Sequence, residues 1–280
     1  PRDIGVSGEY AAQLLHRRRE DIVHYLPPLR ITDTGLEIPD TVLERPLVEA
    51  VNHVLRELSI VGEVKIQDIK DVGFKLLFGN ASLGHVGRGL THLLPVVQLG
   101  LILDPLELFE LDYVFEEDKI KVDPFDRPLN IYLNACTSTA HFALEEPESH
   151  LHPKVQSRLA HWLVSLAMCN RRMMVETHSD HLVRRLRGLI ARSAPGSELE
   201  SWLLENVVVL EVNQAEDGSS SVVSSRLTRD GSLSESWPAD FMDEGSEEDT
   251  AIFEAALAKK PRQPRRAASF IHDEGDEDEP

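Results

Sequence analysis

Two short apolar segments that each end in ionisable side chains constrain the fold more than any other part of the sequence. The first segment ends at Glu145 and Glu146, and the second ends at His178. Each is followed by the apolar spacing of an amphipathic helix, over residues 153–169 and 180–193. Two successive strand-to-helix transitions predict an α/β fold, in which a parallel β-sheet is flanked by helices. Ligands of such sheets bind just beyond the carboxyl ends of the strands, so the two segments indicate one shared site.

The side chains at these predicted strand ends suit a nucleotide and its magnesium ion. Alternation along a strand directs the adjacent carboxylates of Glu145 and Glu146 to opposite sides. One of them can hold Mg²⁺, which prefers oxygen ligands and usually keeps several waters. The other can activate or orient an attacking water, and His178 can reach the terminal phosphate. The chemistry at this edge of the sheet therefore fits phosphoryl transfer.

The sequence around the two segments also resembles a known family. LEEPESHLHP, followed further along by VETHSDHLVRRLR, is similar to the Walker B, D-loop and switch-histidine run of ABC-class ATPases of the overcoming-lysogenization-defect (OLD) group, and to a branch of AAA-type ATPases. The resemblance implies that Glu145 binds Mg²⁺, that Glu146 is the catalytic glutamate and that His178 is the switch histidine. It also places Ser149 and His152 in the D-loop, in contact with the nucleotide. ATP and Mg²⁺ are the implied cofactors, and ATP hydrolysis is the implied activity.

A glycine-rich stretch within residues 80–102 adds a second candidate contact with the nucleotide. Backbone amides at a helix start can face an anion, although an ordinary glycine-rich turn has the same pattern. VGRGLTHLLPVV resembles the family's signature segment, which in ABC-type dimers approaches the nucleotide bound by the opposite subunit. The resemblance implies that Gly87, Arg88 and Gly89 contact the nucleotide in a head-to-tail homodimer. Arg88 departs from the family, which has an aromatic residue there.

The phosphate-binding loop of such ATPases, G-x-x-x-x-G-K-[ST], does not occur in these 280 residues. Because the amides and the lysine of that loop hold the phosphates, we expect the segment alone to bind ATP poorly. The chain begins without Met, and its GEYAA run resembles a part of the family well downstream of the loop. We therefore expect the C-terminal part of an ABC-type ATPase head, completed by an upstream segment or a partner subunit that carries the P-loop.

The expected organisation has four parts. They are a helical, lid-proximal segment with a hairpin at 1–79, the ATPase core lobe at 80–213, a C-terminal hairpin and cap at 214–258, and a disordered charged tail at 259–280. The acidic, proline-containing residues 103–140 are expected to be an insertion in the core lobe, where partner-specific contacts can concentrate.

Apolar periodicity and turn residues predict the elements outside the site. The predicted helices are residues 9–26, 41–61 and 248–258. The predicted strands are residues 64–69, 72–78, 112–115, 119–122, 207–212 and 222–227. Ser179 is the predicted N-cap of the helix at 180–193. Residues 229–244 resemble the C-terminal end of the same ATPase branch, in which Trp237 and Phe241 would be buried anchors.

The composition argues against several classes of protein. A net charge of −19 disfavours a broad nucleic-acid-binding surface. Arg184, Arg185 and Arg187 form one local basic cluster, for which a solvated helix face is the simpler interpretation. No run approaches the ~18 apolar residues of a membrane span, and no N-terminal signal pattern is present, so we expect a cytoplasmic protein with no membrane partner. Cys136 and Cys169 support neither a disulfide framework nor a Cys-type zinc site.

Two other functions compete with the ATPase hypothesis. A non-catalytic interaction module derived from an ATPase would account for the missing P-loop and the altered signature segment. A metallohydrolase would use the carboxylates and imidazoles as metal ligands, and its candidate ligands are Glu145, Glu146, His150, His152, His178 and His181. Their spacing lacks the H-E-x-x-H pattern. For an ATPase, analogy with the OLD group suggests anti-phage defence or DNA transactions beside a nuclease or effector, and it allows a nucleic-acid partner.

Overall fold

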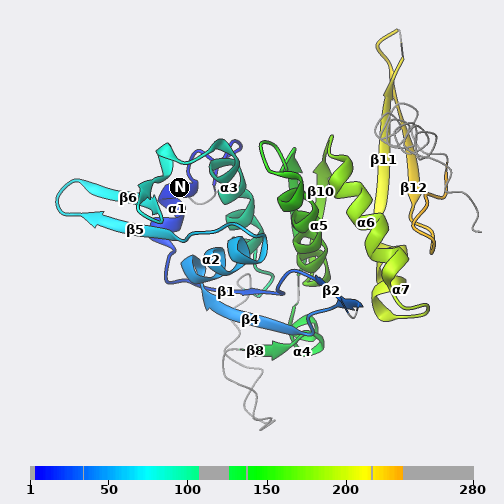
Figure 1. Cartoon of the computed structure of the whole chain (residues 1–280), viewed down its shortest axis with the longest axis horizontal. Helices are drawn as coiled ribbons and strands as arrows, with labels where there is room; N and C mark the ends of the chain where they lie inside the picture. Colours follow the sequence, from blue (N-terminus) through cyan, green and yellow to red (C-terminus); the bar gives the residue numbers. More distant parts are fainter. Residues whose placement is uncertain (1–3, 34, 107–125, 137, 216, 236–280) are drawn as a thin grey trace, which may run out of the picture. The chain divides into compact units, whose positions relative to one another are not determined.

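The computed structural model describes residues 4–33, 35–106, 126–136, 138–215 and 217–235, except for the side chains of residues 126 and 127 (Figure 1). All of them belong to one unit of the chain, Pro1–Ser236. Several predicted features lie outside the described residues, and these are the strands at 112–115 and 119–122, the helix at 248–258, Trp237 and Phe241. The predicted four-part organisation stays a prediction.

Two parallel strands form the part of the fold that carries the predicted site (Figure 1). Strands β9 (Ala140–Glu145) and β10 (Arg171–Glu176) pair in register from their first residues to their last. Helix α5 (Pro153–Met168) connects them, and helix α6 (Asp180–Arg192) follows β10. The predicted α/β class is confirmed, with parallel strands, flanking helices and peripheral antiparallel hairpins.

The two faces of the β9–β10 pair differ in burial. Leu144 is buried, and Phe142, Met173 and Val175 pack against the main hydrophobic core. The side chains on the opposite face are exposed, and these are His141, Ala143, Glu145, Arg172, Met174 and Glu176. Met174 exposes 67% of its surface. Parallel sheets are normally covered on both faces, so the described residues leave one face of this pair without its usual cover.

Helix α5 packs an apolar face into the core, as its spacing predicts. Pro153 stands in the first turn, where its missing N–H removes no helical hydrogen bond. Leu159 and Trp162 are fully buried. Trp162 lies against Gly100 of helix α3 (Arg88–Ile102), where an added Cβ would come within 2.7 Å of the indole ring. Glycine at this position therefore permits the close approach of α3 to α5.

The helix predicted over residues 9–26 is wrong in its second half. Helix α1 (Ala11–Arg17) is short, and strand β1 (Ile22–Tyr25) follows it. Val23 and Tyr25 are buried at alternate positions, and β1 pairs antiparallel with the strand that begins at residue 41. Over so few residues the helical and strand periods share several apolar positions, so pairing with another strand decides the conformation.

The helix predicted over residues 41–61 is also wrong at its start. Residues Thr41–Pro46 form strand β4, which lies between β1 and β8 (Asp126–Pro128) in one sheet. Helix α2 begins at the next residue and spans Leu47–Glu57. Pro46 marks the change because it cannot donate a further ladder hydrogen bond, while its φ of −55° suits the residue before a helix. The predicted apolar stripe of this helix is buried.

Antiparallel hairpins and short helices complete the described fold. Strands β5 (Val64–Ile69) and β6 (Gly73–Phe78) form a confirmed hairpin that β7 (Ala81–Ser82) extends, and β11 (Val208–Gln214) and β12 (Ser220–Arg226) form the other confirmed hairpin. The sequence did not predict the pair β2 (Arg30–Thr32) and β3 (Gly35–Glu37), or helix α4 (Leu129–Ala135). A 3₁₀ turn, Leu83–His85, precedes α3.

Helix α7 (Glu198–Asn206) was not predicted either, although its sequence carries a start signal. The Ser197 hydroxyl accepts a hydrogen bond from the Glu200 backbone N–H at 3.2 Å. The Glu200 carboxylate in turn accepts one from the Gly196 N–H at 2.6 Å. Ser-x-x-Glu before an apolar run is the capping-box pattern, which would have located this helix. No helix in the described part of the chain is long and apolar enough to span a bilayer.

Ser179 is the N-cap of α6, as predicted. Its hydroxyl accepts from the Leu182 N–H at 3.4 Å and donates to the Gln156 side chain at 2.7 Å. Ser179→Ala should lower the free energy of unfolding by about 1 kcal/mol, because the helix start loses its acceptor. Equilibrium urea unfolding measures this change. Ser201→Ala, at an exposed serine inside α7, is the control with little expected effect, and equal destabilisation by both variants would contradict the assigned cap.

Candidate functional site

The site lies where β9 and β10 end side by side. Glu145 and Glu176 are opposite each other in the last pair of the ladder. The Glu146 N–H then donates to the Glu176 carbonyl at 2.9 Å, so the two strands stay paired for one more residue. Beyond this point β9 turns sharply, because Glu146 and His150 adopt left-handed conformations with φ of +41° and +63°. Such conformations cost about 1–2 kcal/mol for residues other than glycine, which makes this turn a strained segment next to the strand ends.

Glu146 and His178 face each other at the two strand ends. The Glu146 Oε1 lies 3.8 Å from the His178 Nε2. The other carboxylate oxygen, Oε2, accepts a hydrogen bond from the Ser149 hydroxyl at 2.7 Å. The side chains of Glu146 and His178 are 47% and 77% exposed, so both groups are open to solvent. The structure therefore brings three predicted residues together: the carboxylate, the imidazole and the serine that orients the carboxylate.

Glu148 is a residue of this site that the sequence reasoning missed. It is only 5% exposed. Its Oε1 accepts from the Thr177 hydroxyl at 2.5 Å and from the His178 N–H at 3.2 Å. Burial of a carboxylate is unfavourable without such donors, so these bonds hold the turn after β9 against the residues that follow β10. The contacts with Thr177 and His178 distinguish Glu148 from Glu145 and Glu146. They depend on the fold, so no spacing rule would have selected Glu148.

The predicted signature glycines lie at the start of α3, beside the same turn. Gly87 is the N-cap of α3, and Arg88 is exposed. A Cβ on Gly89 would come within 2.7 Å of the His150 carbonyl oxygen, so the backbone of α3 touches the strained turn. The His92 and His150 rings meet edge to face, with their centroids 5.7 Å apart. Close packing against His150 thus explains why residue 89 is glycine. The predicted contact of Gly87, Arg88 and Gly89 with the nucleotide stays a prediction.

His152 and Glu145 have different surroundings from the central group. His152 is the N-cap of α5, and its Nδ1 accepts from the Lys154 N–H at 3.3 Å. Glu145 is exposed on the open face of the strand pair, next to Glu176. Two exposed carboxylates at adjacent strand ends offer the oxygen ligands that Mg²⁺ prefers, and this ion commonly takes one or two protein carboxylates together with waters and phosphates. The donor set therefore fits magnesium.

The metallohydrolase hypothesis lacks a ligand set in the described residues. They contain no group of three or more His, Cys, Asp or Glu side chains placed to hold one metal ion. The candidate imidazoles have separate partners: His150 meets His92, while His181 lies 3.6 Å from the Asp180 carboxylate. A transition-metal site would need at least three of the candidate ligands to converge, and in the described residues no more than two do.

Comparison with known proteins identifies the same part of the chain. Residues 134–183 match the family described as AAA ATPase domain. This segment contains β9, the strained turn, α5, β10 and the first residues of α6. No curated protein matches the chain. The segment with Glu146, Glu148 and His178 is thus similar to part of an AAA ATPase domain.

Solved structures give a weaker likeness. One is an SMC ATPase described for ATP-driven dimerization and DNA-stimulated activation, with 12% identity, a TM-score of 0.37, and coverage of 77% of this chain and 93% of that chain. Another is an Smc head bound to the C-winged helix domain of ScpA, with 13% identity, a TM-score of 0.38, and coverage of 65% of this chain. The matched region spans 42% of the second protein's length.

Proposed function

We propose that this chain supplies the magnesium-binding and hydrolytic side chains of an ATPase head. The observation that carries the proposal is the placement of Glu146 and His178 within 3.8 Å at the ends of two parallel strands, in a segment similar to an AAA ATPase domain. A carboxylate and an imidazole at such a position can act on water and on a terminal phosphate.

Each side chain has a role that follows from its surroundings. Ser149 fixes one oxygen of Glu146 and leaves the other directed to His178 and solvent, where an attacking water can be oriented and deprotonated. His178 can donate a hydrogen bond to a phosphate oxygen through its exposed ring. Glu148 binds the His178 backbone N–H and so fixes the distance between the imidazole and the strand end of Glu146.

Glu145 would hold the magnesium ion, directly or through water. When bound, the ion supplies positive charge that neutralises the phosphate oxygens of ATP. Glu176 lies opposite Glu145 in the ladder and presents a second carboxylate to the same open face. The carboxylates of Glu145 and Glu146 can thus serve different functions, one toward the metal and one toward the water.

We further propose that a P-loop-bearing segment covers the exposed face of β9 and β10. This face contains Met174, which is 67% exposed, and parallel strands are rarely stable with an uncovered face. An upstream segment of the same protein or a partner subunit would cover it and bring the phosphate-binding amides to the strand ends. The start of α3, with Gly87 to Gly89, would then face the nucleotide of a second copy in a head-to-tail homodimer.

The process that such an ATPase drives is proposed by analogy alone. The resemblance to the OLD group favours anti-phage defence or DNA transactions in the cytoplasm, beside a nuclease or effector partner. A non-catalytic interaction module remains the second candidate, since Arg88 departs from the family's signature segment.

Metal dependence of phosphate release tests the proposal. In the protein with its P-loop-bearing segment, ATP hydrolysis should require Mg²⁺, stop when a chelator is added, and return when Mg²⁺ but not Zn²⁺ is restored. ATP binding without phosphate release would identify the interaction module instead. Stoichiometric zinc in protein never exposed to a metal-affinity resin would contradict the proposal and favour a metallohydrolase.

A further inference from the structure

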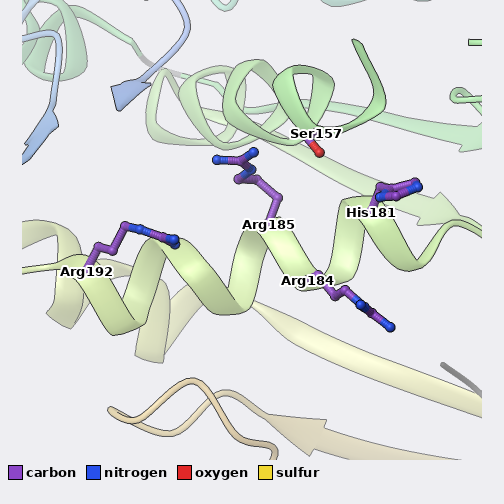
Figure 2. A pocket seen from close by; sticks show the side chains of 5 residues that line it. All are labelled: Ser157, His181, Arg184, Arg185 and Arg192. Carbon is purple, nitrogen blue, oxygen red and sulfur yellow. The ribbon is translucent and has the colours of Figure 1, made fainter. Parts of the chain in front are cut away.

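A basic pocket lies between α5 and α6. It has a volume of about 200 Å³ and is lined by Ser157, His181, Arg184, Arg185 and Arg192 (Figure 2). That volume is several times the space of one water molecule, so the pocket can hold a small anion with part of its hydration shell. The proposed ATPase mechanism uses none of these side chains.

Three arginines of this region have no acidic partner among the described residues. Among the described residues, no carboxylate forms an ion pair with Arg158, Arg185 or Arg192, while Arg184 is paired with Asp180 at 3.3 Å. Arg158 and Arg192 each donate to a neutral backbone carbonyl, of Glu57 and Gly188 respectively. Three uncompensated guanidinium groups are notable in a chain whose net charge is −19. An anion can pair with Arg185, which is partly buried, and with Arg192, which is exposed.

The local electrostatics agree with a concentration of positive charge. Burial lowers the pKa of Arg185, and the charges of Arg192 and Arg158 lower it further. Burial and the same three arginines lower the pKa of the adjacent His161 to about 4, so its ring is neutral at physiological pH. Arg185, Arg158 and Arg192 therefore repel one another, and a bound anion would relieve that repulsion.

The side chains that line the pocket differ in direction (Figure 2). Figure 2 shows the Arg185 side chain extending from α6 toward α5, whereas Arg184 points away from α5. Arg185 and Arg192 lie two helical turns apart on one face of α6. Gly188 lies between them, and a Cβ there would come within 2.5 Å of the Arg192 guanidinium. The glycine thus makes room for Arg192 to fold back along the helix.

We propose that this pocket binds a phosphate group, carried either by a free phosphate compound or by a nucleic-acid backbone. The planar guanidinium of Arg185 presents two N–H groups to neighbouring oxygens, which matches the tetrahedral oxygens of phosphate. The Ser157 hydroxyl can donate a further bond from the opposite helix. Two lining arginines, Arg185 and Arg192, match the charge of a phosphate better than that of a single carboxylate. This inference does not depend on the proposed ATPase activity.

Calorimetric titration with inorganic pyrophosphate tests the site. It is done on the full chain in EDTA, so that a magnesium-dependent nucleotide site does not contribute. Arg185→Gln should weaken binding at least about tenfold, because it removes a charge-assisted, two-pronged contact. Arg192→Gln should weaken pyrophosphate binding less. The affinity of Arg185→Lys should lie between those of wild type and Arg185→Gln, because lysine keeps the charge but cannot make a bidentate contact. Arg56→Gln, which removes an equal charge at a side chain 64% exposed, is the control and should bind as wild type does.

A short DNA duplex distinguishes the two sources of phosphate. If the duplex competes with pyrophosphate and Arg185→Gln weakens both, the pocket takes a nucleic-acid backbone. If pyrophosphate binds and the duplex does not compete, the pocket takes a free phosphate compound. The proposal is overturned if Arg185→Gln and wild type, both folded by circular dichroism, bind the probes equally. It is also overturned if neither probe binds, or if citrate binds as tightly as pyrophosphate.

Discussion

Glu146→Gln should reduce ATP turnover at least about 100-fold while ATP binding stays close to that of the wild type. The amide keeps the size of the carboxylate and can still accept the Ser149 hydrogen bond, so the turn after β9 should keep its shape. It cannot take a proton from an attacking water, because it lacks a basic oxygen. Steady-state phosphate release and equilibrium binding of a fluorescent ATP analogue measure the two effects separately.

The matched control for this experiment is Glu205→Gln, at an exposed position on α7. It changes the net charge equally and should leave both turnover and binding unchanged. Wild-type turnover in the Glu146→Gln protein would remove Glu146 from the mechanism.

Glu148→Ala should lower both turnover and stability. The substitution leaves the Thr177 hydroxyl and the His178 N–H without their acceptor, and each unsatisfied group costs about 1–3 kcal/mol when it is buried. His178 would then lose its fixed distance from Glu146, so kcat should fall about tenfold or more while the KM for ATP changes little. Denaturant unfolding and steady-state kinetics give the two readouts.

A second variant separates positioning from general destabilisation. Leu159→Ala removes a fully buried side chain of α5 and should cost about 2–5 kcal/mol of unfolding free energy. Assayed well below its unfolding temperature, it should keep its kcat. If Leu159→Ala and Glu148→Ala reduce kcat equally, Glu148 acts only through stability, and its positioning role is wrong.

The sequence predicted that Glu146 and His178 would meet, because both occupy positions with a fixed geometric meaning. Acidic and imidazole groups directly after two apolar strands must meet at one edge of a parallel pair, and the contact of Glu146 with His178 agrees with this. Ser179 and Pro153 marked helix starts by their own chemistry. These signals are local and do not depend on distant contacts.

Several of the features that were missed depend on contacts between distant segments. The apolar spacing of residues 9–26 suits either a helix or a strand. Pairing with β4 makes Ile22–Tyr25 a strand. Glu148 became recognisable only when its carboxylate was found against Thr177 and His178, which lie 29 and 30 residues later. The arginine pocket likewise joins Ser157 to side chains of the next helix. Tertiary packing, which a linear pattern does not encode, brings these groups together.

Hydrogen exchange on ATP binding tests the central claim most directly, because it locates the nucleotide on the chain. The Glu146→Gln protein, together with its P-loop-bearing segment, would be saturated with ATP and Mg²⁺ and compared with its nucleotide-free form. We predict slower amide exchange in residues 145–150 and 176–180, the two segments joined by the Glu146–Glu176 and Glu148–His178 hydrogen bonds. Unchanged exchange in both segments at saturating ATP would contradict the assignment of the β9 and β10 ends as the nucleotide site.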